Sequence, residues 1–543
     1  TDEAIWFSFV CHDRQPDLMV VSDARRDASL ENTDSVLLIL DTYRDEQNGF
    51  VFGTNPAGLV YDGQLSKAGN GGSMGSGSIG GAGGGFNINW DGVWEVRTQV
   101  GDFGWSAEFR IPFNTLRYPR EEVQDWGANF QRIIPRRIEK AYWAPLGRQF
   151  NILRLADAGT LSGLEIDDQR NLKFVPYVLA AASDIGNAGT QNDQEWGFDI
   201  KYSLTPALTL DLTYNTDFAQ VEADEAQVSL DRFNLFFPEK RPFFLENAGL
   251  FTVGMPQPVD LFFSRRIGLT DDGEIVPIEA GARVSGGLLG ANVGLMYMQT
   301  EELAGVTPAN RFGVARVNKE LPNRSSLGAI FVNRETTGTL LPEEFDNQTY
   351  GVDGRLGIGE YGLLTGYFAG TSTPGLDRDD QSWALTGSYD SSRWSYSADW
   401  VEVGENFNPE VGFINRSGGY RNLSGRVLRR YRPAGSPLGL LELRPHVSYS
   451  GYWDPDGFQE SGVLHIDNHA EWKSGYELHT AINFTTKGLQ EPFEIYQGVI
   501  IPVGTYRNSE VHLYGQTNPS AWLSFHMSLT AGGFYSGDRL AIS

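Results

Sequence analysis

The sequence predicts an all-β protein: an N-terminal β-sandwich followed by a large antiparallel transmembrane β-barrel of about 18 or more strands. Two observations predict this. Residues 1–165 hold short runs rich in Val, Ile, Phe and Trp, separated by Gly, Asp and Asn turns, which is typical of a sandwich. Residues 171–543 hold segments of about 9 to 14 residues in which apolar and polar residues alternate, which indicates strands with one dry and one wet face.

The sandwich strands are expected where these apolar runs fall. They comprise residues 4–11, 35–44, 49–63, 93–101, 104–113 and 126–136. A glycine-rich insert, GNGGSMGSGSIGGAGGG at residues 69–85, interrupts the pattern. Its composition predicts a flexible loop, because it offers too little apolar surface to pack.

In the second half, the alternation is strict and the connections differ in length. The segments LTLDLTYN (208–215), WSYSADW (394–400) and LSFHMSLTA (523–531) each place apolar and polar residues on opposite faces. Short turns alternate with long polar loops along the chain, as in outer-membrane barrels. A large soluble β protein is the alternative, but many consecutive hairpins with a dry face favour a barrel in lipid. The lipid bilayer is therefore the expected partner, and the N-terminal domain is expected to be periplasmic.

Composition excludes several other classes. The formal net charge is -26, whereas nucleic-acid-binding proteins usually carry a basic surface, so no nucleic-acid partner is expected. Cys11 is the sole cysteine, which excludes a disulfide framework and indicates a small core residue. No run of about 18 apolar residues predicts a transmembrane helix. The sequence opens directly on a predicted strand, so we expect a processed or incomplete N-terminus.

One unusual segment, FNLFFPEKRPFFLENAGLF at residues 233–251, is too charged for a core helix and too apolar for a free loop. We predict that residues 233–258 form a plug inside the barrel or dock the N-terminal domain, with phenylalanines packed on protein and charges paired. An external loop with a small apolar core is the alternative. The residues expected to act are Phe236, Phe237, Glu239, Lys240, Arg241, Phe243, Phe244 and Glu246.

Strand direction can be counted from the connectors. We assume that the strand at 173–182 runs outward. Two strands are apparent before the turn LLGAN (288–292), namely DLFFSRRIG (260–268) and IEAGARVSGG (278–287). The turn falls on the inner side only if one further strand crosses the membrane before it. Residues 219–233 are the candidate for that crossing, so the plug would begin on the inner side. The total of about nineteen strands is odd, whereas such barrels normally have an even number, so further strands are expected beyond this chain.

Several motifs resemble known families. VSDARRD, followed by DSVLLILDTYRDEQNGFVFGTNPAG and GWSAEFRIPFNTLRY, resembles the carbohydrate-binding module family 9-like sandwich. The 233–251 segment followed by LFFSRRIGL resembles the outer-membrane barrels called domain of unknown function 5916. The resemblance implies a cell-envelope protein of a Gram-negative bacterium and implies no particular activity.

Candidate binding residues follow from side-chain chemistry. Sugar-binding modules stack pyranose rings on exposed aromatics and bind hydroxyl groups with polar side chains; the candidates for glycan binding are Trp90, Trp94, Trp105, Glu95 and Asn55, with sandwich core as the alternative. The turn DTYRDEQNG offers Asp41, Asp45 and Asn48 as oxygen ligands for Ca²⁺, with a plain hairpin turn as the alternative.

Histidines concentrate near the C-terminus. The six that fall in the polar phase of the last strands are His446, His465, His469, His479, His512 and His526. On one strand His465 and His469 stand about 13 Å apart and cannot share a metal, but neighbouring strands could bring them to other ligands. The interpretations are a proton- or metal-sensitive patch facing the lumen, or ordinary filling of the wet face. Arg426 and Arg430 favour a mixed-charge lumen that filters anions or glycans.

Catalysis has little support, because the sequence contains no GxSxG, HExxH, P-loop or CxxCH motif. The leading hypothesis is an outer-membrane barrel that passes or captures an oligosaccharide or other polymer. The alternatives are a non-conducting anchor that assembles with other envelope proteins, and an envelope glycan hydrolase. No cofactor other than Ca²⁺ is expected.

Overall fold

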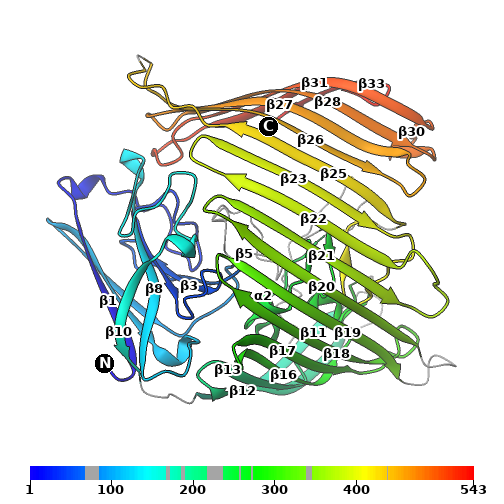
Figure 1. The fold of residues 1–543 in the computed structure, drawn as a ribbon, viewed down its shortest axis with the longest axis horizontal. Coiled ribbons are helices and arrows are strands. Elements are labelled where there is room, and N and C mark those ends of the chain that lie inside the picture. The colour runs from blue at the N-terminus through cyan, green and yellow to red at the C-terminus, as the bar shows by residue number, and fades with distance from the viewer. Residues whose placement is uncertain are drawn as a thin grey trace.

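The computed structural model comprises a small β-sandwich and a large curved sheet (Figure 1). It describes residues 1–67, 85–166, 171–184, 190–216, 236–255, 258–270, 273–337, 345–416, 418–436 and 438–543, with the side chains of 181–184 and 190–193 left aside. The glycine-rich insert therefore lies outside the described residues except for its last glycine. Among the described residues, no helix is long and apolar enough to cross a membrane.

Two antiparallel sheets form the sandwich. One has the order β1-β7-β6, and the other has the order β10-β8-β2-β3-β4-β5 with β9 paired to β8. The strands are β1 Ala4–His12, β2 Ser35–Asp41, β3 Gly49–Thr54, β4 Tyr61–Ser66, β5 Gly85–Asn87, β6 Glu95–Gly101, β7 Gly104–Pro112, β8 Val123–Ile134, β9 Glu139–Tyr142 and β10 Gly159–Glu165. Alternating apolar side chains of both sheets meet in a core that contains Cys11 and Trp105. Cys11 is therefore a small core residue, as expected of a single cysteine in the chain. Burial raises the pKa of the Cys11 thiol to about 11.

The large sheet has 18 antiparallel strands and runs from β11 at one edge to β33 at the other. Its strands are β11 Leu172–Asp184, β12 Thr190–Thr205, β13 Leu208–Tyr214, β16 Ile278–Leu288, β17 Ala291–Thr300, β18 Ala309–Leu321, β19 Ser325–Thr337, β20 Asp346–Ile358, β21 Gly362–Ser372, β22 Gln381–Asp390, β23 Trp394–Val403, β25 Tyr420–Arg429, β26 Leu440–Trp453, β27 Gln459–Trp472, β28 Glu477–Leu489, β31 Gly504–Gln516, β32 His526–Phe534 and β33 Gly537–Ile542. Short strands β29 Phe493–Tyr496 and β30 Val499–Ile501 pair with each other in a loop. The predicted fold class is confirmed.

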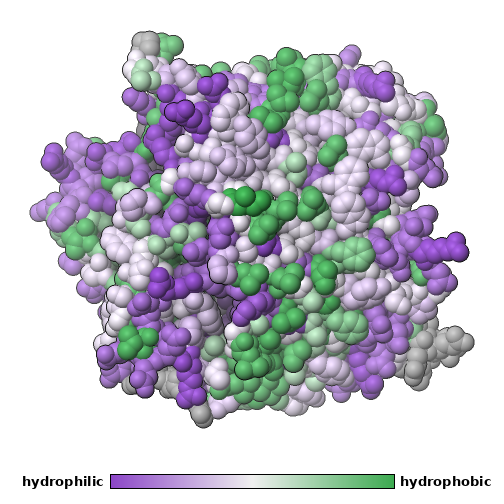
Figure 2. All heavy atoms as spheres, viewed as in Figure 1, coloured by the Kyte–Doolittle hydropathy of each residue, from purple (hydrophilic) through white to green (hydrophobic). Residues whose placement is uncertain are grey.

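The faces of this sheet are inverted relative to a soluble protein. On β13 the polar Thr209, Asp211 and Thr213 are buried, while Tyr214 on the opposite face is exposed. Trp394 and Tyr396 on β23 are likewise exposed. Figure 2 shows hydrophobic side chains gathered over the strands of the sheet, and hydrophilic ones over the sandwich. Burial of polar groups with exposure of aromatic and aliphatic ones is the distribution expected of a barrel in lipid.

A plug fills the concave side of the sheet from β16 to β25. It contains the one-turn helices α1 Pro242–Leu245 and α2 Ala248–Phe251, and a small sheet of β14 Gly254–Met255, β15 Val259–Asp260 and β24 Phe413–Ile414. Its apolar side chains form one cluster with inward-facing residues of the strands. The cluster includes Phe243, Phe244, Phe251, Val259, Leu261, Phe262, Met296, Met298, Phe312, Val314, Ile330, Val332, Val401 and Tyr420.

The structure corrects the predicted strand count around this plug. DLFFSRRIG is not a barrel strand: only its first residue, Asp260, belongs to a strand, the two-residue β15, and most of the following residues are buried in the plug. Because β13 pairs directly with β16, no additional crossing is required. The segment proposed for that crossing, 219–233, lies outside the described residues. The connection from Tyr214 to Ile278 therefore leaves and returns at the same rim, opposite the short turns, so the prediction that the plug begins on the inner side is wrong.

The sandwich lies against the rim that carries the short turns (Figure 1). Gln47 donates a hydrogen bond to the carbonyl of Ser325, and Arg154 donates one to the carbonyl of Glu360, both in or beside short turns. Plug residues 245–252 reach this same rim, as the contacts below show. The plug therefore extends through the interior from the long-loop rim to the sandwich.

Candidate functional site

The junction between sandwich and plug centres on the carboxylate of Glu246. Its Oε1 accepts a hydrogen bond from Arg117 Nη2 at 2.8 Å, and its Oε2 accepts one from Lys201 Nζ at 2.9 Å. Trp90 Nε1 donates to the same Oε2 at 3.3 Å. Arg117 and Trp90 belong to the sandwich, while Lys201 lies on β12. One buried plug carboxylate therefore joins all three parts of the chain.

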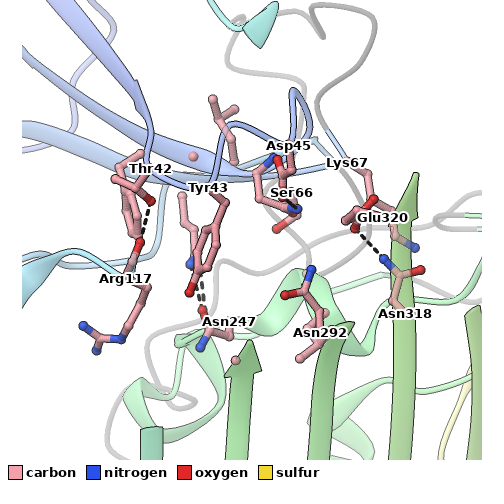
Figure 3. A pocket seen from close by; sticks show the side chains of 18 of the residues that line it. Thr42, Tyr43, Asp45, Ser66, Lys67, Arg117, Asn247, Asn292, Asn318 and Glu320 are labelled. Atoms are coloured by element: carbon pink, nitrogen blue, oxygen red, sulfur yellow. Dashed lines mark hydrogen bonds between the residues drawn. The ribbon is translucent and has the colours of Figure 1, made fainter. Parts of the chain in front are cut away.

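Around Glu246, the two bodies are in close contact. Gln64 donates to Asn247 Oδ1 at 2.9 Å, and Lys67 donates to the carbonyl of Thr252 at 2.9 Å. A Cβ atom built on Gly249 would lie 2.0 Å from Ser66 Oγ, so only glycine fits there without a shift. Figure 3 shows polar side chains of both bodies facing each other across a small cavity of about 70 Å³. The junction is thus packed to near contact.

Within the plug, Glu239 and Arg241 form a fully buried ion pair, with Arg241 Nη2 2.7 Å from Glu239 Oε2. Arg241 also donates to the carbonyls of Ile267 and Ser264, and its guanidinium lies 4.3 Å from the ring centre of Phe244. A buried charge is tolerated only when paired and hydrogen-bonded, and this pair meets both conditions. These two plug charges therefore neutralise each other inside the plug.

The remaining plug candidates also occupy defined positions. Phe236 stacks on Phe263 with ring centres 5.0 Å apart, and Phe237 lies under the guanidinium of Arg265 at 5.5 Å. The backbone N–H of Lys240 donates to Glu239 Oε1 at 3.1 Å. These contacts, with the buried Phe243, fix the plug as a packed unit. Its phenylalanines pack on other side chains of the protein.

Beyond the plug, the inner wall is polar and carries the histidines. The strand register places His446 opposite Asp467, and His469 opposite His479, on β26, β27 and β28. His469 Nε2 lies 2.8 Å from Asp467 Oδ2, and His465 Nε2 lies 3.5 Å from the same oxygen. The rings of His469 and His479 stack at 3.6 Å. The three neighbouring strands thus bring four of the histidines, His446, His465, His469 and His479, together around Asp467.

The other histidines and arginines of this wall have separate partners. His512 Nδ1 lies 2.9 Å from Thr530 Oγ1, and His526 begins β32 with its side chain exposed. Arg430 pairs with Asp390 at 2.8 Å, whereas Arg426 is exposed. Arg430 also lines a cavity of about 580 Å³ between the sandwich loop 147–149 and the barrel rim. Its wall carries both signs of charge: Arg148, Arg430, Arg432, Arg444, Glu360, Glu442 and Glu471.

The sugar-binding candidates of the sandwich do not form an exposed platform. Trp90, Trp94 and Trp105 are 3%, 8% and 0% exposed and pack in the core, so they are not the glycan-stacking residues and match the core alternative instead. A pyranose ring stacks on an open ring face, and these rings have none. The side chain of Asn55 is buried and accepts the backbone N–H groups of Ala57 and Leu59 as part of a turn.

Glu95 lies apart from these tryptophans on an exposed strand position. Its Oε1 is 3.4 Å from Arg110 Nη1, and both side chains are substantially exposed. The pair joins β6 to β7 on the outer side of the three-stranded sheet.

The turn with the calcium candidates uses its carboxylates on its own backbone. Asp41 accepts the N–H of Glu46 at 2.9 Å, and Asp45 accepts the N–H groups of Gln47 and Asn48 at 2.8 and 2.7 Å. Burial first, and the nearby Asp45 second, raise the pKa of Asp41 to about 8. These oxygens close a hairpin between β2 and β3, which is the alternative that the sequence left open.

A carboxylate cluster that the sequence analysis missed lies elsewhere in the sandwich. Asp27, Asp62 and Asp91 converge on the guanidinium of Arg26, whose Nη2 lies 2.6 Å from both Asp62 and Asp91. Burial raises the pKa of Asp62 to about 7. Arg26 already supplies the cation in this cluster. The motif VSDARRD contains two of these residues, but its spacing gives no sign of the partners that lie far along the chain.

These features define an all-β protein whose 18-stranded antiparallel sheet encloses a plug from its own chain. Residues 169–281 match the family model for the domain of unknown function DUF5916, which confirms that part of the predicted resemblance. The match covers β11 to β13, the plug elements α1, α2, β14 and β15, and the start of β16, but not β24. The carbohydrate-binding module resemblance stays a prediction. No curated protein matches the chain.

Among solved structures, the chain is similar to Pseudomonas aeruginosa OccK11 (OpdR). The two share 9% sequence identity over 96% of each chain, with a TM-score of 0.24. At this level of similarity, the fold assignment depends on the strand pairing within this chain itself.

Proposed function

We propose that this chain is an outer-membrane β-barrel with its sandwich in the periplasm, and that it passes or captures a polar solute such as an oligosaccharide. The observation that supports this is the polar inner wall of β26 to β31. The apolar cluster of the plug reaches only as far as Tyr420 and Tyr452. Beyond it, half-buried histidines, arginines and carboxylates face the interior, which is the lining of a water-filled route.

In this proposal the plug and the sandwich act together as a gate. The plug fills the side of the interior next to β16 through β25, and Glu246 ties it to Arg117 of the sandwich. Movement of the sandwich would therefore pull on the plug through a buried ion pair. The cavity of about 580 Å³ between the sandwich loop and the rim gives the solute an opening on the periplasmic side.

A non-conducting anchor is the second candidate, and the extent of the plug favours it. The cluster joins plug residues to inward-facing side chains on strands from β16 to β25, so a large part of the interior is dry and packed. A barrel filled in this way could hold the sandwich at the membrane for assembly with other envelope proteins. The two candidates differ in one measurable property, which is whether ions cross the barrel.

Conductance in planar bilayers separates them. The structure permits a clean plug deletion: Tyr214 pairs with Ala280, so a short Gly-Ser turn can replace residues 216–277. If the chain is a gated route, the native protein conducts weakly, the deletion conducts strongly, and added oligosaccharide blocks the current. An anchor gives no current in the native protein or when the junction is loosened by Glu246→Gln. The deletion exposes the apolar cluster, which can prevent folding. Glu246→Gln keeps the plug in place, so it tests the proposal even if the deletion variant does not fold.

A further inference from the structure

The histidine cluster on the inner wall is built like a metal site. Two sets of three side chains bring all their ligand atoms within 4.8 Å of one another: His446 with His465 and Asp467, and Asp467 with His469 and His479. The sets come from three adjacent strands, and Asp467 belongs to both. We propose that Asp467, His446 and His465 bind a divalent transition-metal ion of the zinc class. His469 and His479 form a second set of ligands that shares the carboxylate of Asp467.

The two oxygens of Asp467 are arranged for different partners. Oδ1 accepts the backbone N–H groups of Asn468 and Thr480, at 2.6 and 2.9 Å. These bonds fix the orientation of the carboxylate. Oδ2 is left facing the imidazoles, with Nε2 of His469 at 2.8 Å and Nε2 of His465 at 3.5 Å. Two imidazole nitrogens therefore point at the same carboxylate oxygen, an arrangement that polar residues lining a water-filled interior do not need.

Hydrogen bonds also set the ring tautomers for ligation. Nδ1 of His446 lies 3.2 Å from the carbonyl oxygen of Arg444, which can only accept, so Nδ1 carries the proton. Nδ1 of His465 lies 2.6 Å from Asn483 Oδ1, and the amide of Asn483 is oriented by its donation to Glu510. Both histidines therefore keep a lone pair on Nε2. A second partner on the other ring nitrogen is the usual support of metal-binding histidines.

The charge around the cluster is compatible with a cation. Two guanidiniums lie near the cluster. Arg426 is in register with Ser448, which is in register with His465, and Arg444 lies 3.7 to 3.8 Å from carboxylate oxygens of Glu442, Glu471 and Glu477. The three carboxylates outnumber these two cations. Imidazole with a carboxylate selects zinc, copper or nickel over magnesium and calcium, which prefer oxygen-only sites. Three protein ligands leave a fourth position open, as in zinc sites that bind water or a donor atom of a solute.

The test measures metal binding directly and does not depend on conductance. Full-length protein without a histidine tag is titrated with Zn²⁺ in detergent against a chromophoric chelator, with Mg²⁺ and Ca²⁺ in parallel. The expected result is one Zn²⁺ per chain and no competition from the other two ions. His465→Gln and Asp467→Asn should each weaken Zn²⁺ binding by at least about tenfold, since even loss of an outer partner has an effect of this size.

His512→Gln and His526→Gln are the matched controls, because both histidines lie on the same face of β31 and β32 but outside the cluster. They should leave the affinity within about threefold of the native value, against the tenfold loss above. Asn483→Leu keeps all ligands and should weaken binding by about 10- to 100-fold, which keeps the test valid if Asp467→Asn fails to fold. Absence of Zn²⁺ binding, or an equal loss in cluster and control variants, would overturn the proposal.

Discussion

The carboxylate of Glu246 offers the sharpest perturbation of the junction. Glu246→Gln keeps the shape of the side chain and removes its charge, which leaves the buried guanidinium of Arg117 without its anion. Removing one partner of a buried pair costs about 3–5 kcal/mol. Arg117 retains the carbonyls of Asn114 and Leu116 as acceptors, so we expect the lower end, about 3 kcal/mol.

This loss applies to the contact between sandwich and plug, and hydrogen–deuterium exchange measures it. At 1.36 kcal/mol per tenfold, about 3 kcal/mol corresponds to a roughly 160-fold larger open population. Peptides covering residues 85–95 and 245–252 should exchange faster by up to that factor, while peptides in β2 and β3 stay protected. The control is Glu95→Gln, whose exposed pair with Arg110 is worth about 0–1 kcal/mol. Unchanged exchange in Glu246→Gln, or equal acceleration in the control, would refute the reasoning.

Three further predictions follow from close contacts and buried charges. Gly249→Ala should destabilise the junction by about 1–3 kcal/mol because its methyl group meets Ser66, and Ser66→Gly should restore native exchange rates; lack of rescue would contradict the contact. Asp41 has its pKa raised to about 8 in the folded sandwich, so stability should fall as pH rises from about 4 to 8 and then level off. Thermal unfolding of Asp41→Asn should show a flatter profile over that window, and an identical profile would argue against it. Asp211→Asn leaves the buried Arg283 unpaired and should lower barrel stability by about 3–5 kcal/mol, read from heat-dependent gel migration; native migration would contradict this.

The sequence predicted features that depend on local pattern. The alternation in WSYSADW placed Trp394 and Tyr396 on the outer face and Ser395 on the inner face, because successive side chains of any strand point to opposite sides. The same rule predicts that all six C-terminal histidines point to the inner face of the sheet. Such predictions need no knowledge of which strands are neighbours.

Features that depend on distant partners could not be predicted in this way. The pattern of DLFFSRRIG predicts a barrel strand, because a short apolar run does not distinguish a membrane strand from a buried plug segment. Glu246 was predicted to pair, but Arg117 and Lys201 lie 129 and 45 residues away in sequence and show no local sign of it. Trp90 and Trp94 are glycan-binding candidates by residue type alone, yet they pack in the core and Trp90 also contacts the plug.

The orientation of the two faces of the large sheet is tested most directly by spin labels at single cysteines. Cys11→Ser supplies the background, Val352→Cys and Leu385→Cys report the outer face, and Ser397→Cys reports the inner one. In reconstituted bilayers, labels at 352 and 385 should relax with oxygen and resist a water-soluble nickel chelate, and the label at 397 should do the reverse. Equal access of the nickel chelate to both faces would contradict the account of a barrel in lipid.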